Sequence, residues 1–433
     1  MGFFRNVSGT IGAKLAIIIF GFLSGMITAR WLGPNGRGLL ALVTSIPPTI
    51  WMLSSFGINQ ASVYYINKKA YPLKKIIGIC FIIPLVLGTI IALSIWFSRH
   101  GLILKAFPYL NDFFLLVALI PLPFLLVQNS FVGVLRAVDK FAIINIRQIV
   151  RAGLGLLAGS VVLILLDRGI SNLLVCFLAL DIVIALWMVL EVHRICKIRP
   201  YFEKKIAKDM ISFGLKSYVQ NMIGFLHNRL DMYMIAYFLV PAQIAYYDIA
   251  VVLGELLLFL PQSITFVILP DLVRGTEEEK AKSVAKVARV SLFIALVMAL
   301  GLVTLGYYLI IFVYGNDFAE SYIVLCLLLP GLVISSMNGV TVPYYTSMAR
   351  QKITIICSIL SLLLNAGLNL YAIPTYGAYG AAATTSITYS AFSFMLLTVF
   401  VREQDVHYSE ILVIRKEDFM AFYEKLKQYR MKN

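Results

Sequence analysis

The chain alternates between long apolar stretches and short polar connections over nearly its whole length. About twelve apolar stretches stand out, each roughly 20 residues long or a little longer, which is the length that a helix needs to cross a bilayer core. Such continuous runs lack the two-residue alternation of a membrane barrel, and a helix satisfies its own backbone polar groups in lipid. The pattern predicts membrane-spanning helices over residues 9–30, 38–60, 75–98, 113–135, 144–166, 170–192, 213–237, 243–268, 288–313, 320–345, 353–373 and 378–400.

Basic residues gather in every second connection between these stretches. The connections on one side hold only Arg30, Arg37, Arg99, Lys105 and Arg168. Lys14 and Arg229 lie inside predicted spans, and every other lysine and arginine falls on the opposite side. Because short cytoplasmic connections carry an excess of lysine and arginine, the basic-rich side is the cytoplasm. The charges therefore predict an even number of crossings, with both termini inside the cell.

The composition excludes a soluble enzyme. Of the 433 residues, 60% are hydrophobic and only 14% are charged, which is far too apolar for a soluble protein. The formal net charge of +15 would suggest nucleic acid as the partner of a soluble chain. Here the basic connections face an anionic leaflet, so membrane lipids are the expected partner and nucleic acid is not. The five cysteines have no paired spacing, so no metal or other cofactor is indicated.

The predicted spans divide into two equal sets around the largest cytoplasmic connection, at roughly 193–212. The sequence thus predicts an all-α integral membrane protein with two six-helix lobes, residues 1–200 and 201–402. Because six is an even number, the two halves would be parallel repeats. A faint repeat agrees: Leu32-Gly33-Pro34 precedes Gly38, and Leu239-Val240-Pro241 precedes Ala245. Residues 403–433 form a polar cytoplasmic tail, either with a short amphipathic helix on the inner leaflet or frayed in water.

Several motifs follow one another in the order found in a known family. They are the stretch 28–38, Phe56-Gly57-Ile58-Asn59-Gln60-Ala61, Phe213-Gly214-Leu215, Asn228-Arg229-Leu230-Asp231, Ala245-Tyr246-Tyr247, Tyr314-Gly315-Asn316-Asp317-Phe318, and Asn365 to Asn369 followed by Pro374, Tyr376-Gly377 and Gly380-Ala381-Ala382. Together they resemble the polysaccharide exporters of the MOP superfamily, which includes O-antigen flippases, lipid II flippases and multidrug (MATE) antiporters. The resemblance covers nearly the whole chain. It implies two six-helix lobes around a central cavity that opens alternately inward and outward, in the plasma membrane of a bacterium or archaeon.

The resemblance also implies a substrate in which a glycan is linked to a polyprenyl pyrophosphate. Arginine suits such a head group, because its planar fork binds two phosphate oxygens at once and stays charged when desolvated. Arg30 and Arg229 are the leading candidates, since the resemblance places the first and seventh spans at the interface of the lobes. The further candidates for substrate contact are Arg37, Lys14, Tyr246 and Tyr247.

Several of these basic and aromatic residues also have a structural interpretation. Lys14 lies within reach of the cytoplasmic interface, and the tyrosine pairs fit an aromatic belt as well as stacking on a sugar. Arg147 and Arg151 lie four residues apart on one helix face near the start of the fifth span. They could receive substrate, but anchoring at the cytoplasmic surface is the favoured interpretation.

Four carboxylates lie inside predicted spans, where an ionisable group costs roughly 2.5–3.5 kcal/mol at a helix centre. They are Asp181, Asp231, Asp248 and Glu255. Either they neutralise buried basic groups, or they couple transport to protons or Na⁺, because a buried carboxylate can titrate or bind a hard cation. The first span has Lys14 and no carboxylate, which departs from the cation-coupled drug antiporters that the chain resembles.

Two functions fit these features. The favoured one is a non-enzymatic flippase that moves a lipid-linked oligosaccharide from the inner to the outer leaflet by alternating access, with a polysaccharide polymerase and glycosyltransferases as candidate partners. The alternative is a cation-coupled multidrug or small-molecule antiporter of the same fold. A basic cavity favours lipid pyrophosphate and an acidic one favours organic cations; we expect a basic cavity lined by Arg30 and Arg229. An acyltransferase would need a partnered catalytic histidine, and His227 stands alone in its span.

Overall fold

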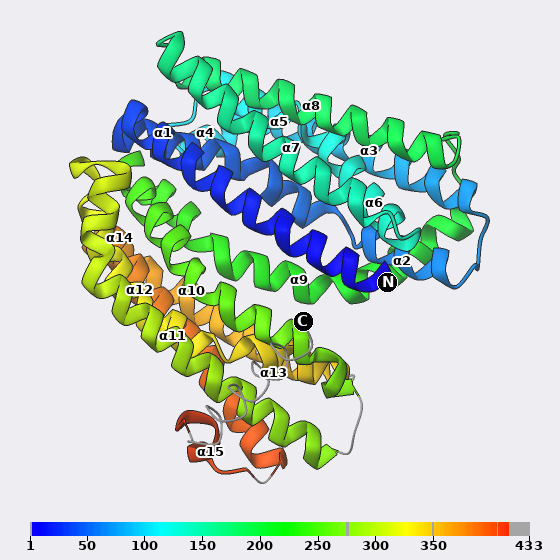
Figure 1. The fold of residues 1–433 in the computed structure, drawn as a ribbon. Helices are drawn as coiled ribbons and strands as arrows, with labels where there is room; N and C mark the ends of the chain where they lie inside the picture. Colours follow the sequence, from blue (N-terminus) through cyan, green and yellow to red (C-terminus); the bar gives the residue numbers. More distant parts are fainter. Residues whose placement is uncertain (1, 274–276, 349, 405, 415–433) are drawn as a thin grey trace. The chain divides into compact units, whose positions relative to one another are not determined.

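The computed structural model describes residues 2–273, 277–348, 350–404 and 406–414, and its elements are helical throughout these ranges (Figure 1). The predicted amphipathic helix of the tail lies outside the described residues. The elements are α1 (Gly2–Ser54), α2 (Ile58–Asn67), α3 (Leu73–Ser98), η1 (Arg99–Ile103), α4 (Leu104–Ala106), α5 (Asp112–Leu119), α6 (Leu122–Ala137), α7 (Phe141–Gly159), η2 (Ser160–Leu165), α8 (Ile170–Ile195), α9 (Lys204–Phe238), α10 (Pro241–Val273), α11 (Glu277–Tyr314), η3 (Asn316–Phe318), α12 (Glu320–Ser335), α13 (Asn338–Ser347), α14 (Gln351–Gln404) and α15 (Tyr408–Leu412).

Within these residues, nine helical segments are long and apolar enough to cross a membrane. Two of them, Gly12–Ser54 and Gln351–Gln404, have 43 and 54 residues. At 1.5 Å per residue they would measure about 65 and 80 Å, more than twice the bilayer core of about 30 Å. Both break at a glycine with a left-handed backbone: Gly33 and Gly377 each have a φ of 65°. The all-helical membrane fold is confirmed, and the count of twelve spans stays a prediction.

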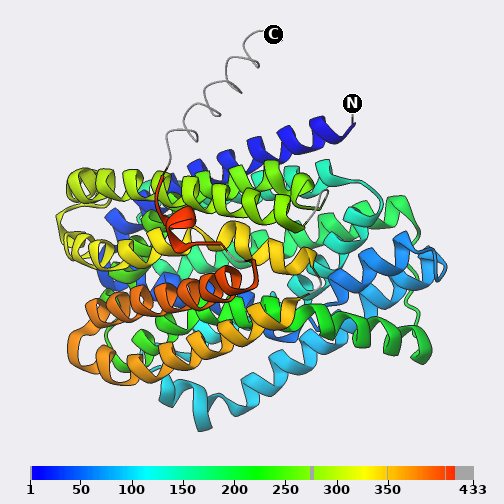
Figure 2. The same cartoon turned by 90° about the horizontal axis from the view of Figure 1, so that it is seen from below.

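The break at Gly377 folds α14 back on itself. The Ser361 hydroxyl donates to the carbonyl oxygen of Thr388 at 2.8 Å, so residues 27 positions apart lie side by side. Figure 2 shows the two halves of α14 next to each other. At the turn, a Cβ on Gly380 would lie 2.1 Å from the carbonyl oxygen of Ala372. Only a glycine lets the two backbones approach this closely.

The chain forms two compact units by its internal contacts. Unit 1 contains 1–225, 239–245 and 313–317, and unit 2 contains 226–238, 246–312 and 318–433. The predicted boundary near residue 200 stays a prediction; by these contacts, the first part of α9, as far as Phe225, belongs to unit 1. Each unit is described by itself below.

The connection after α8 is fastened to the base of α3 within unit 1. The Lys75 ammonium and the Tyr201 hydroxyl donate to Glu203 at 2.9 and 2.6 Å. These two bonds, that from Tyr201 first, lower the pKa of Glu203 and keep it ionised. Nearby, the Tyr71 hydroxyl donates to Asp209 on α9 at 2.5 Å, and this bond raises the pKa of Tyr71 to about 12. The predicted loop between the lobes is thus partly tied down.

Unit 1 also holds the start of α9 against the break between α1 and α2. Phe56 and Gly57 have positive φ values of 44° and 68°, which end α1 and turn the chain into α2. A Cβ on Gly57 would lie 2.3 Å from the carbonyl oxygen of Gly214 on α9. The Tyr218 hydroxyl donates to the carbonyl oxygen of Met52, and Phe213 stacks on Tyr64 with ring centroids 4.2 Å apart. Two glycines therefore let the backbones touch, and aromatic rings close the contact.

The two turns of the faint sequence repeat meet within unit 1. A Cβ on Gly38 would lie 1.7 Å from the carbonyl oxygen of Pro241 and 3.2 Å from the amide nitrogen of Ala245. The Asn35 side-chain oxygen accepts the amide N–H of Ala242 at 3.2 Å. The small residues that mark the repeat are therefore needed where one turn packs on the other.

Unit 2 packs its core among α11, α13, the end of α14 and α15. Its largest fully buried side chains include Tyr344, Tyr345 and Phe400. The α12 and α14 helices also lie close together, because the Ser386 hydroxyl accepts the amide N–H of Gly331 at 2.8 Å. A Cβ on Gly331 would lie 2.4 Å from the Cα atom of Ser386.

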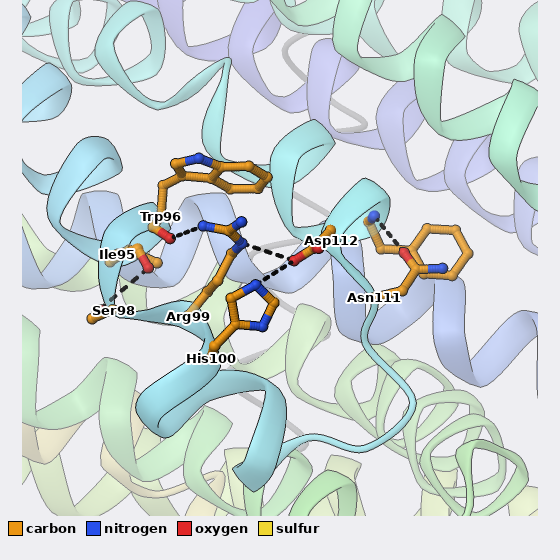
Figure 3. Close-up of polar contacts among 8 residues, drawn as sticks. Ile95, Trp96, Ser98, Arg99, His100, Asn111 and Asp112 are labelled. Atoms are coloured by element: carbon orange, nitrogen blue, oxygen red, sulfur yellow. Dashed lines mark hydrogen bonds and ion pairs between the residues drawn. The ribbon is translucent and has the colours of Figure 1, made fainter.

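A polar cluster lies at the end of α3, on the side that the charges assign to the outside (Figure 3). The Arg99 guanidinium stacks 3.9 Å from the centre of the Trp96 ring and donates through Nε to Asp112 at 2.8 Å. His100 lies 3.8 Å from the same carboxylate oxygen. The cluster joins the π-helical turn η1 to the first turn of α5, and it pairs Arg99 with Asp112.

We expect Gly57→Ala to destabilise the protein. Alanine costs about 1–2 kcal/mol at a left-handed φ, and its Cβ would collide with the Gly214 backbone for about 1–3 kcal/mol more. The melting temperature in detergent should fall by about 5 °C. Gly169→Ala is the matched control, because Gly169 has a φ of −76° and no atom within 4 Å of an added Cβ. Equal melting temperatures for the two variants would contradict the contact.

Candidate functional site

A cavity of about 420 Å³ lies within unit 1, among α1, α2, α5, α6, α7 and α8. Its wall combines charged, amide and aromatic side chains with prolines. It is lined by Val43, Thr44, Pro47, Pro48, Trp51, Asn59, Val117, Ala118, Pro121, Leu125, Gln128, Asn129, Val132, Arg136, Arg147, Gln148, Arg151, Leu174, Phe177, Leu178 and Asp181. Since Arg136 and Arg147 flank a predicted cytoplasmic connection, the cavity lies toward the inner side of the lobe.

Three arginines and one aspartate give the cavity a net positive charge. Arg136 lies in the last turn of α6, and Arg147 and Arg151 lie one turn apart on α7. Arg151 donates through Nε to Asp181 on α8 at 2.6 Å and lies 5.6 Å from the centre of the Phe177 ring. The buried Nε atom of Arg147 has no hydrogen-bond partner among the described residues. The wall therefore keeps donor capacity for an anion.

Amide side chains line the same cavity. The Asn59 amide donates to both the backbone and the side-chain oxygen of Asn129, each at 3.0 Å. Trp51 lines the wall as well, and its buried indole nitrogen has no hydrogen-bond partner in the part of the chain that the structure describes. An aromatic ring with amides around it provides both apolar surface and hydrogen bonds for a polar ligand.

The predicted substrate residues of unit 1 lie elsewhere. Arg30 is exposed on α1 and donates through Nε to the carbonyl oxygen of Val313 at 2.9 Å. Arg37 is half-buried and Lys14 is exposed, and none of the three lines this cavity. Arg147 and Arg151 do line it, although their position near the cytoplasmic surface favoured anchoring. Their spacing on α7 was visible in the sequence, but the helices that complete the cavity were not.

Unit 2 holds Arg229 among carboxylates. Arg229 is exposed on α9, and its charge interacts electrostatically with Glu255 on α10. The charge of Asp248 acts on Glu255 as well. His227 lies one helical turn before Asp231 and is 9% exposed. Its ring stacks on Tyr389 with centroids 5.0 Å apart, and neither ring nitrogen has a hydrogen-bond partner among the described residues. His227 therefore packs as a core aromatic ring.

Asp231 lies at the centre of a buried polar network in unit 2. It is 1% exposed, and its carboxylate accepts three hydrogen bonds. Tyr247 and Thr385 donate to Oδ2 at 2.7 and 2.8 Å, and Asn369 donates to Oδ1 at 2.6 Å. The Asn369 amide also lies 3.1 Å from the side-chain oxygen of Asn365. The partners of Asp231 that these bonds define are uncharged, so this carboxylate is stabilised by dipoles and not by a basic side chain.

This network changes the interpretation of the tyrosine pair. Tyr247 is 4% exposed and its hydroxyl donates to Asp231, and its contact with a substrate stays a prediction. Tyr246 is half-buried and packs edge-on against Phe318, with ring centroids 6.3 Å apart. The Tyr247 hydroxyl therefore holds the Asp231 carboxylate in position.

The side chains around Asp231 are rich in oxygen atoms. Asp231, Asn365 and Thr385 each place an oxygen in this network, and oxygen is the ligand that hard cations prefer. The buried side-chain oxygen of Asn369 has no hydrogen-bond partner in the described ranges. The sequence predicted ion coupling or charge pairing for Asp231 but no such role for Asn365, Asn369 or Thr385. A signal was present, since Ser361, Asn365 and Asn369 recur every four residues on one face of a largely apolar span.

These features define a class of protein. Long apolar helices and a polar, cationic cavity inside one helical unit are typical of a multi-pass membrane transporter. Residues 27–323 match the family described as polysaccharide biosynthesis protein, which is more than half of the chain. The chain therefore belongs to this family, and it is a multi-pass protein of the plasma membrane.

Known proteins resemble it along most of its length. A protein described as a probable low-salt glycan biosynthesis flippase, Agl15 of Haloferax volcanii, is 21% identical over 377 residues, covering 85% of this chain and 77% of that protein. The lipid II flippase MurJ in an inward closed conformation matches with a TM-score of 0.77 at 15% identity, over 91% of this chain and 87% of MurJ. An inward-facing MATE family transporter matches with a TM-score of 0.73 at 14% identity, over 90% and 94%. The chain therefore shares the fold of these two structures.

The net charge of the cavity can be measured by thiol chemistry. We expect a Gln148→Cys variant to react about tenfold faster with an anionic than with a cationic methanethiosulfonate, because arginines concentrate anions at their wall. The parent chain gives the background of the native cysteines. Adding Arg147→Gln should lower the ratio of the two rates. A ratio that favours the cation would contradict a basic cavity.

Proposed function

We propose that the protein is a flippase that moves a polyprenyl-pyrophosphate-linked oligosaccharide from the inner to the outer leaflet for the synthesis of surface polysaccharide. Membership of the polysaccharide biosynthesis family and similarity to a protein named as a glycan biosynthesis flippase support this proposal. The observation that carries it is the cationic cavity of unit 1, with three arginines and one aspartate in its wall.

The positive charge of the cavity suits the most costly step of transport, which is the transfer of the charged pyrophosphate across the bilayer. The pyrophosphate must leave water part of the way across the bilayer, where an unpaired charge costs many kcal/mol. Guanidinium groups replace the lost water with charge-assisted hydrogen bonds. Arg136, Arg147 and Arg151 would hold the phosphates, and Trp51 with the amides of Asn129 and Gln148 would contact the first sugar. An antiporter of organic cations would need the opposite charge.

Arg30 and Arg229 remain in the proposal as contacts for the substrate at other stages of transport. Both are exposed on helices. Arg30 is oriented by the carbonyl oxygen of Val313, and Arg229 lies near Glu255. Alternating access would carry the head group past them while the lipid tail stays in the membrane. A polysaccharide polymerase and glycosyltransferases are the proposed partners.

Ion coupling through Asp231 is the second part of the proposal. Its buried carboxylate is held by neutral donors, so a proton or Na⁺ at this point would neutralise the charge without breaking an ion pair. The ligands come from α9, α10 and both halves of α14, so an ion here would draw these helices together. Binding and release of the ion at Asp231 would then change the packing of these helices.

The flippase proposal is tested by reconstitution. We expect Arg147→Gln to slow the flipping of a polyprenyl-pyrophosphate-linked disaccharide in proteoliposomes at least tenfold, because one charge-assisted contact is worth about 1.5–3 kcal/mol. Arg99→Gln is the matched control, since Arg99 lies in unit 1 and outside the cavity, and should flip at the wild-type rate. Arg229→Ala should abolish surface glycan in cells while the protein still inserts. Wild-type protein that does not flip the lipid would refute the proposal.

The coupling proposal is tested by ligand-dependent stability. We expect Na⁺ to raise the melting temperature of the wild type relative to choline at equal ionic strength, because an ion that binds only the folded state stabilises it. Asp231→Asn should lose this response. Glu278→Gln, which removes an exposed carboxylate paired with Lys282, should keep it. A response of the wild type to pH alone would assign the coupling to protons, and a response to neither would contradict it.

A further inference from the structure

One carboxylate lines the otherwise basic cavity of unit 1. Asp181 extends from α8 toward α7, where its Oδ1 atom accepts from the Nε atom of Arg151 at 2.6 Å. The side chains of this pair are 35% and 21% exposed, so both lie partly shielded at the wall. Such a carboxylate lowers the attraction of the cavity for an anion. Its presence there needs an explanation that the binding of phosphate alone does not give.

The hydrogen bond to Asp181 involves only one of the three guanidinium nitrogens of Arg151. One guanidinium nitrogen, Nε, bonds to Asp181. The Nη1 atom lies over Gly155, 3.2 Å from where a Cβ would be. Arg147 lies one turn earlier on the same helix, and both Arg151 and Asp181 act on its charge. Asp181 therefore neutralises one of two like charges that are held one turn apart on α7.

A phosphate would compete with Asp181 for the same arginine. Carboxylate and phosphate oxygens both accept from the guanidinium fork, and phosphate offers more charge and more acceptors. The wall also holds donors that Asp181 leaves unsatisfied. The buried Nε atom of Arg147 and the buried Nε1 atom of Trp51 have no hydrogen-bond partners within the described chain. An entering phosphate gains these contacts in addition to Arg151.

We propose that Asp181 is a resident counter-ion, which the substrate phosphate displaces from Arg151 and which expels that phosphate when the carboxylate returns. The proposal rests on the proposed flippase function and concerns the release step of that same site. A site that moves an ion must bind it well enough to admit it and weakly enough to let it leave. The Asp181 carboxylate sets that balance, and it keeps Arg147 and Arg151 in place while the cavity holds no substrate.

The test separates binding from turnover. Farnesyl pyrophosphate is the probe for binding to the full-length protein in neutral-lipid nanodiscs, with farnesol as the uncharged reference. We expect Asp181→Asn to bind farnesyl pyrophosphate about tenfold more tightly, because the competing charge is gone. In proteoliposomes the same variant should show a lower KM and a lower kcat for the polyprenyl-pyrophosphate-linked disaccharide. Asp181→Glu should return both values toward the wild type.

Asp112→Asn is the matched control. Asp112 also accepts from an arginine Nε atom in unit 1, Arg99 at 2.8 Å, but it lies in the first turn of α5 and outside the cavity (Figure 3). The affinity of Asp112→Asn for farnesyl pyrophosphate and its kcat should equal those of the wild type.

The outcomes distinguish the two proposals. If the wild type binds farnesyl pyrophosphate and Asp181→Asn binds it with equal or weaker affinity, the counter-ion role is overturned. The proposed flippase function would then remain in place. Tighter binding with an unchanged kcat would overturn the role in release. A wild type that binds farnesyl pyrophosphate no better than farnesol would overturn the proposed function and the counter-ion together. If Asp181→Asn and Asp112→Asn both have a lower melting temperature but unchanged binding and kcat, the substitutions show only the structural effect of losing an ion pair. That result would contradict the proposal.

Discussion

The structure depends on one constraint: a polar group that lies in lipid must find a partner within the chain. Asp231 meets this demand with a phenol, a hydroxyl and an amide, and Arg151 meets it with Asp181. The exceptions are informative. Among the described residues, Trp51 and Arg147 at the cavity and Asn369 in the Asp231 network each have a buried polar atom without a partner. Other such atoms, on His227, Ser291, Ser321 and Tyr345, lie elsewhere, so the lack of a partner does not by itself mark a ligand site.

The two units carry opposite chemistry. Unit 1 offers guanidinium groups and amide donors to an anion, whereas unit 2 gathers carboxylate, amide and hydroxyl oxygens that suit a cation. Both rest on glycine contacts that bring backbones together: Gly57 on Gly214 in unit 1, and Gly331 on Ser386 in unit 2. Close backbone packing leaves little freedom to the side chains above it.

Hydrophobic runs and alternating charge predicted the helical membrane fold, because bilayer thickness fixes the length of a span. They also predicted separate spans on either side of Gly33 and of Gly377, where the two longest helices break. Ionisable residues inside spans pointed to Asp181 and Asp231 because burying charge is costly. The partners were missed for a different reason. Asn365, Asn369 and Thr385 are neutral, and Arg151 reaches Asp181 from another helix, so only the tertiary arrangement brings them together.

The way α9 is shared has a mechanical consequence. Its first part is held by Tyr218 and by the bond between Tyr71 and Asp209, while the residues after Phe225 belong to unit 2. Helix α9 therefore runs without a break from residues of unit 1 into residues of unit 2. Asp231 lies six residues after Phe225, which is fewer than two helical turns along this helix. The carboxylate is thus carried by the same hydrogen-bonded backbone as the part of α9 that Tyr218 and Asp209 hold.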